Sequence, residues 1–194
     1  MFDFDGVIAD SWCGQKVAFV NALRDHGLHD FATSAVFRDL MDTNWFEGLS
    51  NAGLPDHVIR LIEAEWAAQT PDVFPGMPDV IARLALHHVV LVITSSATDD
   101  VRRVLKDRHV SGVTDVIGGD VEPSKTRKIR SARARYGRSL QAWYVCDTVG
   151  DVVEARAAGA AVVGTAWGWH GEERLRRSKP DRIARHPHDL LDLL

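Results

Sequence analysis

The sequence has 194 residues, 45% hydrophobic and 26% charged, which fits an ordinary globular protein with one core or a core and a small insert. Its net charge of −4 offers no basic surface, so neither nucleic acid nor a membrane is expected as a partner. Cys13 and Cys146 lack metal-site spacing and are expected to be buried thiols in a reducing compartment. The sequence has no apolar run long enough to span a membrane and no signal peptide, so we expect a cytoplasmic protein. We expect it to be a monomer or a homodimer.

The chain begins with MFDFDGVIAD, in which one aromatic residue separates Asp3 from Asp5. In an extended strand residues i and i+2 point to the same side, so both carboxylates would leave a strand together. Gly6 follows at once, where the backbone must turn sharply or approach a ligand closely. Few residues precede Gly6, so either the first strand is truncated or the natural chain begins further upstream. Such an acidic pair alone usually marks a surface turn, and its meaning depends on the partners that the rest of the chain supplies.

Residues 12–70 have helical periodicity and contain no strand candidate. The apolar stripes lie at 17–23, 36–41 and 58–66. The helix signals at their ends are Gly27 as a stop, Thr33 or Ser34 as an N-cap, and Pro55 in a first turn. We therefore expect a small all-helical cap domain at 13–73, inserted after the first strand and closed by a proline-rich linker at 71–78. The alternative is that these helices pack directly on the main sheet.

From residue 74 onward, short apolar strands alternate with amphipathic helices. The expected strands are 89–93, 113–117, 142–146, 161–165 and a weak one at 182–184. The expected helices are 79–86, 98–108, 125–136, 152–158 and a terminal helix from Asp189. This alternation predicts an α/β fold, a Rossmann-like parallel sheet covered by helices on both faces, in a core domain formed by 1–12 and 74–194. Such sheets bind ligands beyond the carboxyl ends of their strands.

Two of these strands lead into residues suited to an anion. Thr94, Ser95 and Ser96 follow the expected strand 89–93, and Ser96 with Asp99 fits a capping box for the next helix. Lys125 opens the helix after the third strand, where a cation opposes the helix dipole, so its position suggests an anion for it to meet.

A second acidic pair, Asp147 and Asp151, follows the expected strand 142–146. Neighbouring strands lie about 4.8 Å apart, so Asp3 and Asp147 could share one small hard cation if their strands are adjacent. Carboxylate oxygens with room for water suit Mg²⁺, whereas a hydroxyl, a lysine and free amides suit a phosphoryl group.

Taken together, these motifs resemble the haloacid dehalogenase-like phosphohydrolases, and within them the phosphoglycolate-phosphatase type, over nearly the whole chain. The matching stretches are FDFDGVIADS at 2–11, LVITSS at 91–96, EPSKTRKI around Lys125, CDTVGDVVEARAAGA at 146–160 and VVGTAWGWHGEERL at 162–175. In the commoner form of the lysine motif a proline follows the lysine, so Lys128 is a minor competitor to Lys125. The helical insert falls where this family places its cap.

The resemblance implies a phosphatase that hydrolyses a small phosphorylated metabolite, either phosphoglycolate or a sugar phosphate. It implies that Asp3 attacks phosphorus and forms an aspartyl-phosphate, while Asp5 acts first as an acid and then as a base. Mg²⁺ would be the cofactor, held by Asp3, the backbone carbonyl of Asp5 and Asp147, with Asp151 supporting it.

The same resemblance implies a phosphate cradle. Thr94 and Lys125 would bind the phosphoryl oxygens and act in catalysis, with Gly6 and Ser95 beside them. Recognition of the leaving group would come from the cap, where the candidates are Arg38, Asn44 and Trp45, with Trp12 at the junction with the core.

Three alternatives stay open. A phosphomutase would keep the same core motifs. A receiver-type signalling domain also uses an acidic pocket with a threonine and a lysine, although its motifs follow another chain order. A non-catalytic binding protein could also be built on this fold.

Overall fold

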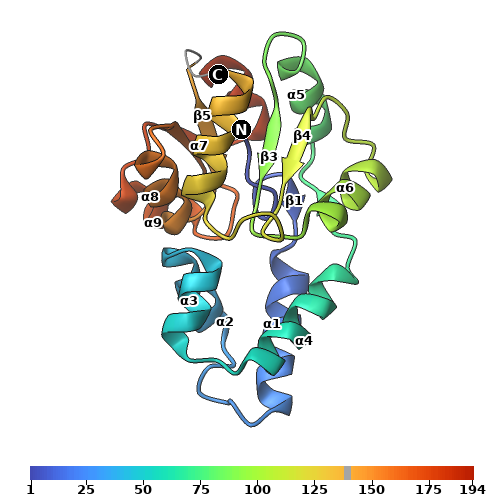
Figure 1. The fold of residues 1–194 in the computed structure, drawn as a ribbon, viewed down its shortest axis with the longest axis vertical. Coiled ribbons are helices and arrows are strands. Elements are labelled where there is room, and N and C mark those ends of the chain that lie inside the picture. Colours follow the sequence, from blue (N-terminus) through green and yellow to red (C-terminus); the bar gives the residue numbers. More distant parts are fainter. Residues whose placement is uncertain (138–140) are drawn as a thin grey trace.

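A parallel sheet runs through the larger part of the molecule, and a separate group of helices lies below it in Figure 1. The computed structural model describes residues 1–137 and 141–194. The parallel pairs are β3 (Leu91–Ile93) with β4 (Asp115–Ile117), β5 (Trp143–Cys146) with β6 (Ala161–Thr165), and β6 with β7 (Arg182–Ala184).

The first residues of the chain join these two groups of strands. Phe2 forms parallel bridges to both Val92 and Val145. Its N–H donates to the Leu91 carbonyl at 2.8 Å, and the Asp3 N–H donates to the Val145 carbonyl at 2.9 Å. The segment therefore lies at the centre of the sheet, between β3 and β5, and Asp3 follows directly at its carboxyl end.

Helices cover both faces of this sheet. They are α5 (Met77–Leu84), α6 (Thr98–Asp107), α7 (Lys125–Tyr136), α8 (Val149–Ala157), α9 (Gly171–Ser178), the short 3₁₀ turn η2 (Pro187–Asp189) and α10 (Leu190–Leu193). Alternate residues of a strand face opposite sides, so Val92 packs in one apolar cluster with α5, α6 and α10. Leu91 and Ile93 pack in the other cluster, with α7, α8 and α9. The predicted fold class is confirmed.

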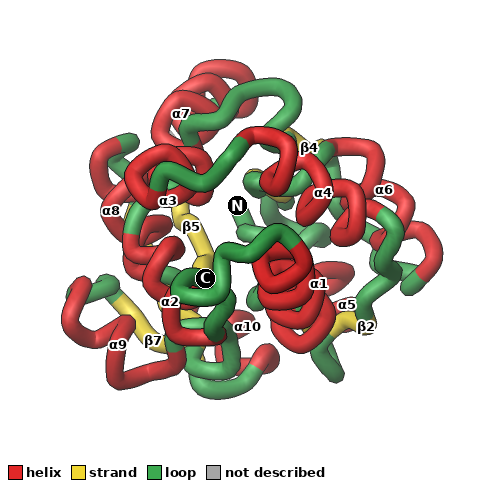
Figure 2. The backbone as a smooth tube through the Cα atoms, turned by 90° about the horizontal axis from the view of Figure 1, so that it is seen from below, coloured by secondary structure: helices red, strands yellow, loops and turns green. Residues whose placement is uncertain are grey.

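The remaining helices form the cap. They are α1 (Trp12–Asp25), α2 (Ser34–Asp39), the 3₁₀ turn η1 (Leu40–Asp42), α3 (Trp45–Ala52) and α4 (Asp56–Ala67). Seen from below in Figure 2, α1 and α4 lie on one side of the cap, and α2 and α3 lie on the other. They share an apolar core that includes the fully buried Phe19, Leu23, Phe37, Val58 and Ile62. The domain boundaries at 12/13 and 73/74 stay a prediction.

The two chain crossings between the core and the cap are paired with each other. Strands β1 (Ala9–Asp10) and β2 (Asp72–Val73) are antiparallel, with Ala9 opposite Val73. Sequence analysis expected only a linker here, because two-residue strands carry no periodicity to detect.

Polar contacts join the other side of the cap to the core. Asn44 Nδ2 donates to Glu154 Oε2 at 2.6 Å, and Arg174 Nη1 donates to Asp39 Oδ1 at 2.8 Å. His170 Nδ1 accepts the Val149 N–H at 3.0 Å, which leaves Nε2 to donate to the Arg38 carbonyl at 3.0 Å.

Several details differ from the expectations. Helix α6 begins at Thr98, and its N-cap Ala97 makes no side-chain cap, so the Ser96–Asp99 capping box is wrong. Asp120 caps this helix instead, because its Oδ1 accepts the Thr98 N–H at 2.7 Å. Cys13 is exposed rather than buried, while Cys146 is buried as expected.

Other helices also differ from the expectations. Helix α3 is not among the expected helices, α5 begins two residues earlier than expected, and α8 begins three residues earlier. In the described parts of the chain, no helix combines the length and apolar character that crossing a membrane requires.

Candidate active site

Three carboxylates from separate parts of the chain meet at the carboxyl end of the sheet. Asp3 follows the central segment, Asp147 follows β5, and Asp151 lies in the first turn of α8. One carboxylate oxygen from each lies within 4.8 Å of the others, and all three residues are buried. Their convergence follows from the parallel pairing of residues 1–3 with β5, which brings both strand ends to one edge.

Lys125 is the first residue of α7 and reaches into this group. Its Nζ lies 2.7 Å from Asp3 Oδ2 and 2.7 Å from Asp151 Oδ1. Burial alone would lower the pKa of Lys125, but the charges of Asp151 and Asp3 outweigh burial and raise it above its ordinary value. The lysine is therefore a fixed cation that faces Asp3.

Three ionised carboxylates would carry more negative charge than one lysine balances. Burial raises the pKa of Asp151 to about 7, and burial followed by the charge of Asp3 raises that of Asp147 well above its usual range. Among the described residues, Asp147 Oδ1 and Asp151 Oδ2 are buried oxygens without a hydrogen-bond partner. Buried carboxylate oxygens without donors are costly, so this set fits a hard divalent cation such as Mg²⁺.

Asp5 lies apart from that group and is held by two side chains. Ser96 Oγ donates to Asp5 Oδ2 at 2.5 Å, and Gln15 Nε2 donates to Asp5 Oδ1 at 2.6 Å. Burial raises the pKa of Asp5 despite these hydrogen bonds. A carboxyl group whose pKa is raised in this way is suited to exchange a proton with a reacting group beside it.

Gly6 makes the close approach that the sequence suggested. Its φ is +72°, and a Cβ there would lie 2.0 Å from Asp147 Oδ2 and 2.8 Å from Trp169 Cδ1. Gly168 is equally tight, since a Cβ there would lie 2.1 Å from the Asp147 Cβ. The Trp169 N–H donates to Asp147 Oδ2 at 2.7 Å, so the loop after β6 orients this carboxylate.

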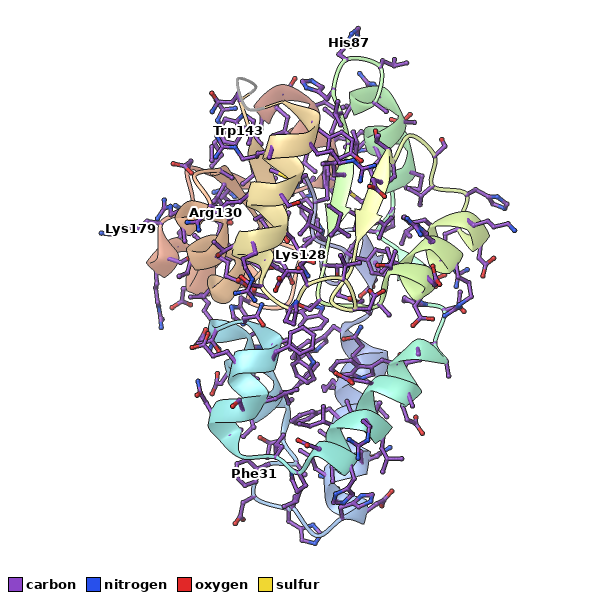
Figure 3. The ribbon with its side chains drawn as sticks, viewed as in Figure 1. Phe31, His87, Lys128, Arg130, Trp143 and Lys179 are labelled. Carbon is purple, nitrogen blue, oxygen red and sulfur yellow. The ribbon has the colours of Figure 1, made fainter. Side chains whose placement is uncertain are left out.

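Thr94 and Ser95, at the end of β3, line a cavity that Asp3, Asp5 and Lys125 also line. Thr94 Oγ1 accepts the Ser96 N–H at 3.1 Å, which holds the turn that follows the strand. Lys128, one turn after Lys125 on α7, donates from Nζ to the Thr94 carbonyl. Burial, and then the charge of Lys125, lowers the pKa of Lys128 to about 8. Figure 3 labels Lys128 at the end of the core that faces the cap.

Sequence reasoning missed Gln15, Ser96 as a partner of Asp5, and Trp169. Gln15 lies in a helix where glutamine is unremarkable, and the sequence around Ser96 fits a helix cap. Trp169 belongs to the WGWHG stretch, whose contact with Asp147 runs through its backbone and therefore leaves no signal in residue type.

The four residues suggested for recognition of the leaving group have different positions in the structure. Trp45 lines the cavity. Asn44 instead contacts Glu154 across the junction, Trp12 stacks on Phe37 with ring centroids 5.3 Å apart, and Arg38 lies over the Trp12 ring.

The core and the cap enclose a cavity of about 500 Å³ between them. Its core side carries Asp3, Asp5, Thr94, Lys125 and Asp147. Its cap side is contributed by α1, η1, α3 and α4. A substrate held there would have one end on the charged group and the other against the cap.

The family comparison matches residues 1–165 to the haloacid dehalogenase-like hydrolases. A phosphoglycolate phosphatase from Synechococcus elongatus is 26% identical over 200 residues, covering 98% of this chain and 94% of that protein. A phosphoglycolate phosphatase from Yersinia pestis is 26% identical over 210 residues, covering 98% and 90%.

The fold has counterparts among solved structures. A haloacid dehalogenase-like family hydrolase from Streptococcus pneumoniae superposes with a TM-score of 0.83 at 21% identity, covering 99% of this chain and 95% of that one. A hydrolase from Pseudomonas syringae gives a TM-score of 0.77 at 19% identity, covering 98% and 94%. With the family model spanning most of the chain, the resemblance drawn from the motifs is confirmed, and this chain belongs to the haloacid dehalogenase-like hydrolases.

Proposed function

We propose that this protein is a Mg²⁺-dependent phosphatase that hydrolyses a small phosphate monoester through an aspartyl-phosphate on Asp3. The observation that carries the proposal is the buried group of Asp3, Asp147 and Asp151, with Lys125 2.7 Å from Asp3, at the end of a cavity. The names of the two curated relatives, both phosphoglycolate phosphatases, support the reaction class.

Asp3 is the proposed nucleophile. Its Oδ1 accepts the Phe4 N–H at 2.8 Å, and its Oδ2 lies 2.7 Å from Lys125 Nζ, so the carboxylate is fixed in position. As Asp3 attacks, Thr94, Ser95, Lys125 and the backbone at Gly6 hold the phosphoryl oxygens.

Asp5 is the proposed acid and base. With its pKa raised by burial, it can give a proton to the leaving oxygen as the phosphorus–oxygen bond breaks. The resulting carboxylate then takes a proton from the water that hydrolyses the aspartyl-phosphate. Ser96 and Gln15 hold the two Asp5 oxygens through both steps.

Mg²⁺ would be held by Asp3, the Asp5 backbone carbonyl, Asp147 and Asp151. When bound, it neutralises negative charge on the nucleophile and the phosphoryl oxygens, so that one anion can approach another. We also propose that the protein acts in the cytoplasm, as a monomer or homodimer, without a nucleic-acid or membrane partner. Its net charge of −4 and its two free cysteines support this setting.

Turnover of p-nitrophenyl phosphate by the purified protein tests the proposed function directly. We expect steady release of p-nitrophenol with Mg²⁺, loss of activity with EDTA, and recovery when Mg²⁺ is restored. A protein that folds and binds Mg²⁺ but releases no p-nitrophenol under any of these conditions would contradict the proposal.

The stabilisation by Mg²⁺ is expected to depend on pH. Burial raises the pKa of Asp147 and Asp151, so in metal-free protein the folded state holds protons that the unfolded state has lost. As pH rises from about 4 towards 7, these two groups therefore lower the free energy of unfolding of the metal-free protein. At low pH, Mg²⁺ must displace their protons in order to bind. The rise in melting temperature on adding Mg²⁺ should thus be larger at about pH 7.5 than at about pH 5.

The Asp147→Asn variant is the control for this measurement, because it removes one proposed ligand at nearly constant volume. Its Mg²⁺-induced shift should be small at both pH values. An equal shift for wild type at both pH values would argue against binding of the ion at these carboxylates.

A further inference from the structure

We propose that the physiological leaving group is uncharged and carries a flat apolar ring, such as an aromatic alcohol, and is not a carboxylate like glycolate. The inference rests on the proposed phosphatase function and concerns the cap side of the same cavity. It comes from three observations: where the leaving group must lie, which side chains surround it there, and which charges face it.

The position of the leaving group follows from Asp5. The oxygen that departs from phosphorus must meet the Asp5 carboxyl group to receive its proton. Gln15 Nε2 donates to that carboxyl group at 2.6 Å, and the Gln15 backbone carbonyl accepts the Trp66 indole N–H at 3.0 Å. Asp5, Gln15 and Trp66 all line the cavity, so a leaving group that extends from Asp5 to the cap side meets α1 and the Trp66 ring on α4.

Aromatic side chains make up much of the cap wall. Trp45, Phe46 and Trp66 all line the cavity, and the Trp45 and Trp66 rings lie 4.8 Å apart at 44°. Phe37 packs behind both, at 6.3 Å and 5.8 Å, so their orientation is fixed by the cap core. A flat ring gains contact area against such a wall, and aromatic pairs add to the free energy of burial.

Phe46 extends this wall to the core. A Cβ on Gly119 would lie 3.0 Å from the Phe46 Cζ, so the Phe46 ring rests against a backbone without a side chain. The apolar surface therefore continues from α4 across α3 to the loop after β4.

The charges facing the cavity oppose a second anionic group. Outside the proposed catalytic group, the acidic residues Glu63, Asp100 and Asp120 line it. Among the described lining residues, the cations are Lys125 and Arg103. Lys125 is paired with Asp3 and Asp151.

Arg103 and the side-chain amide of Gln69 also already have hydrogen-bond partners. Arg103 donates to the Ala67 carbonyl at 2.7 Å and to Thr70 Oγ1 at 2.8 Å, and it lies 3.5 Å from Asp100. The Gln69 amide donates to the Gly14 carbonyl at 3.3 Å. A carboxylate on the leaving group would thus lose water without gaining a cation, a costly exchange.

The test compares two substrates that release primary alcohols, benzyl phosphate and 2-phosphoglycolate. We expect kcat/KM for benzyl phosphate to be higher by about tenfold or more, the discrimination that one apolar group in a pocket supplies. Trp66→Leu should lower kcat/KM for benzyl phosphate by about tenfold while leaving inhibition by inorganic phosphate unchanged, because phosphate does not reach the cap wall. Phe46→Leu, assayed in the same way, provides a second variant if Trp66→Leu folds poorly.

Glu63→Gln tests the charge argument. It removes a negative charge from the cap wall and should raise kcat/KM for 2-phosphoglycolate by about threefold or more. Glu65→Gln on the same helix is the matched control, since Glu65 is exposed and does not line the cavity, and no change is expected.

The outcomes separate this inference from the function on which it rests. If 2-phosphoglycolate is hydrolysed as efficiently as benzyl phosphate or better, the inference is overturned and the phosphatase proposal stands. If p-nitrophenyl phosphate and both test substrates stay intact, the phosphatase proposal fails and this inference fails with it.

Discussion

Replacing Asp3 with asparagine is expected to lower kcat for p-nitrophenyl phosphate by about a thousandfold or more, the scale of losing a covalent nucleophile. An amide oxygen is a poor nucleophile and carries no charge to attract phosphorus in concert with Lys125. The fold should survive, because Lys125 keeps its contact with Asp151 at 2.7 Å and the backbone pairing of Asp3 does not involve its side chain. Initial rates and a thermal melt of the same preparation measure both effects.

Asp107→Asn is the matched control for this variant. Asp107 is an exposed carboxylate near the end of α6, outside the cavity, so its kcat should match wild type. Retention of a tenth or more of the wild-type kcat by Asp3→Asn would rule out Asp3 as the nucleophile. Loss of turnover in that variant alone would exclude a binding protein without catalytic activity.

Gly6→Ala is expected to damage the active site and the fold together. Gly6 has φ of +72°, a conformation that costs an L-residue about 1 kcal/mol. The new methyl group would also lie 2.0 Å from Asp147 Oδ2, and the fully buried Asp147 has little room to retreat. Since a displacement of about 1 Å can cost a hundredfold in rate, kcat should fall by about that factor or more.

Gly27→Ala isolates the effect of the backbone. Gly27 has φ of +74°, and a Cβ there would meet nothing within 4 Å. This variant should lose about 1 kcal/mol of unfolding free energy and keep its full kcat. Melting curves and initial rates of Gly6→Ala and Gly27→Ala measure the two effects. Equal kcat in the two variants would show that the close approach of Gly6 to Asp147 is unimportant for catalysis.

Most of the candidate site residues could be predicted because they follow the ends of the expected strands. A parallel sheet places every carboxyl end at one edge, so residues as distant in the chain as Asp3 and Asp147 could be expected to meet if their strands were adjacent. The structure provides that adjacency through the pairing of Asp3 with Val145. Their catalytic and metal-binding roles stay a prediction.

The sequence favours Lys125 as the lysine of the site and keeps Lys128 as a minor competitor. Lys125 and Lys128 are three residues apart, so they lie on the same face of a helix and periodicity cannot separate them. In the structure Lys125 reaches the carboxylates, while Lys128 donates to the Thr94 carbonyl. Which lysine reaches further depends on how α7 sits against the sheet, and that is set by packing across the whole core.

The hydrogen-bond partners of Asp5 could not be predicted from the sequence, for a different reason. Ser96 satisfies the local pattern of a helix cap, but Asp120 takes that position and frees Ser96 for Asp5. Gln15 comes from the cap, so its contact with Asp5 depends on how the two parts of the molecule dock. Local sequence patterns describe neighbours along the chain and do not include competition from residues far away.

The paired crossings β1 and β2 have a mechanical consequence. The chain connects the cap to the core on the α1 and α4 side (Figures 1 and 2), whereas on the α2 and α3 side the two are joined by non-covalent contacts, among them Asn44 with Glu154 and Phe37 with Trp169. Both covalent connections therefore lie on one side of the cap, and the opposite side depends on non-covalent contacts alone. A substitution that weakens the side-chain contacts would therefore loosen the packing of Phe46 against Gly119 more than the pairing of β1 with β2.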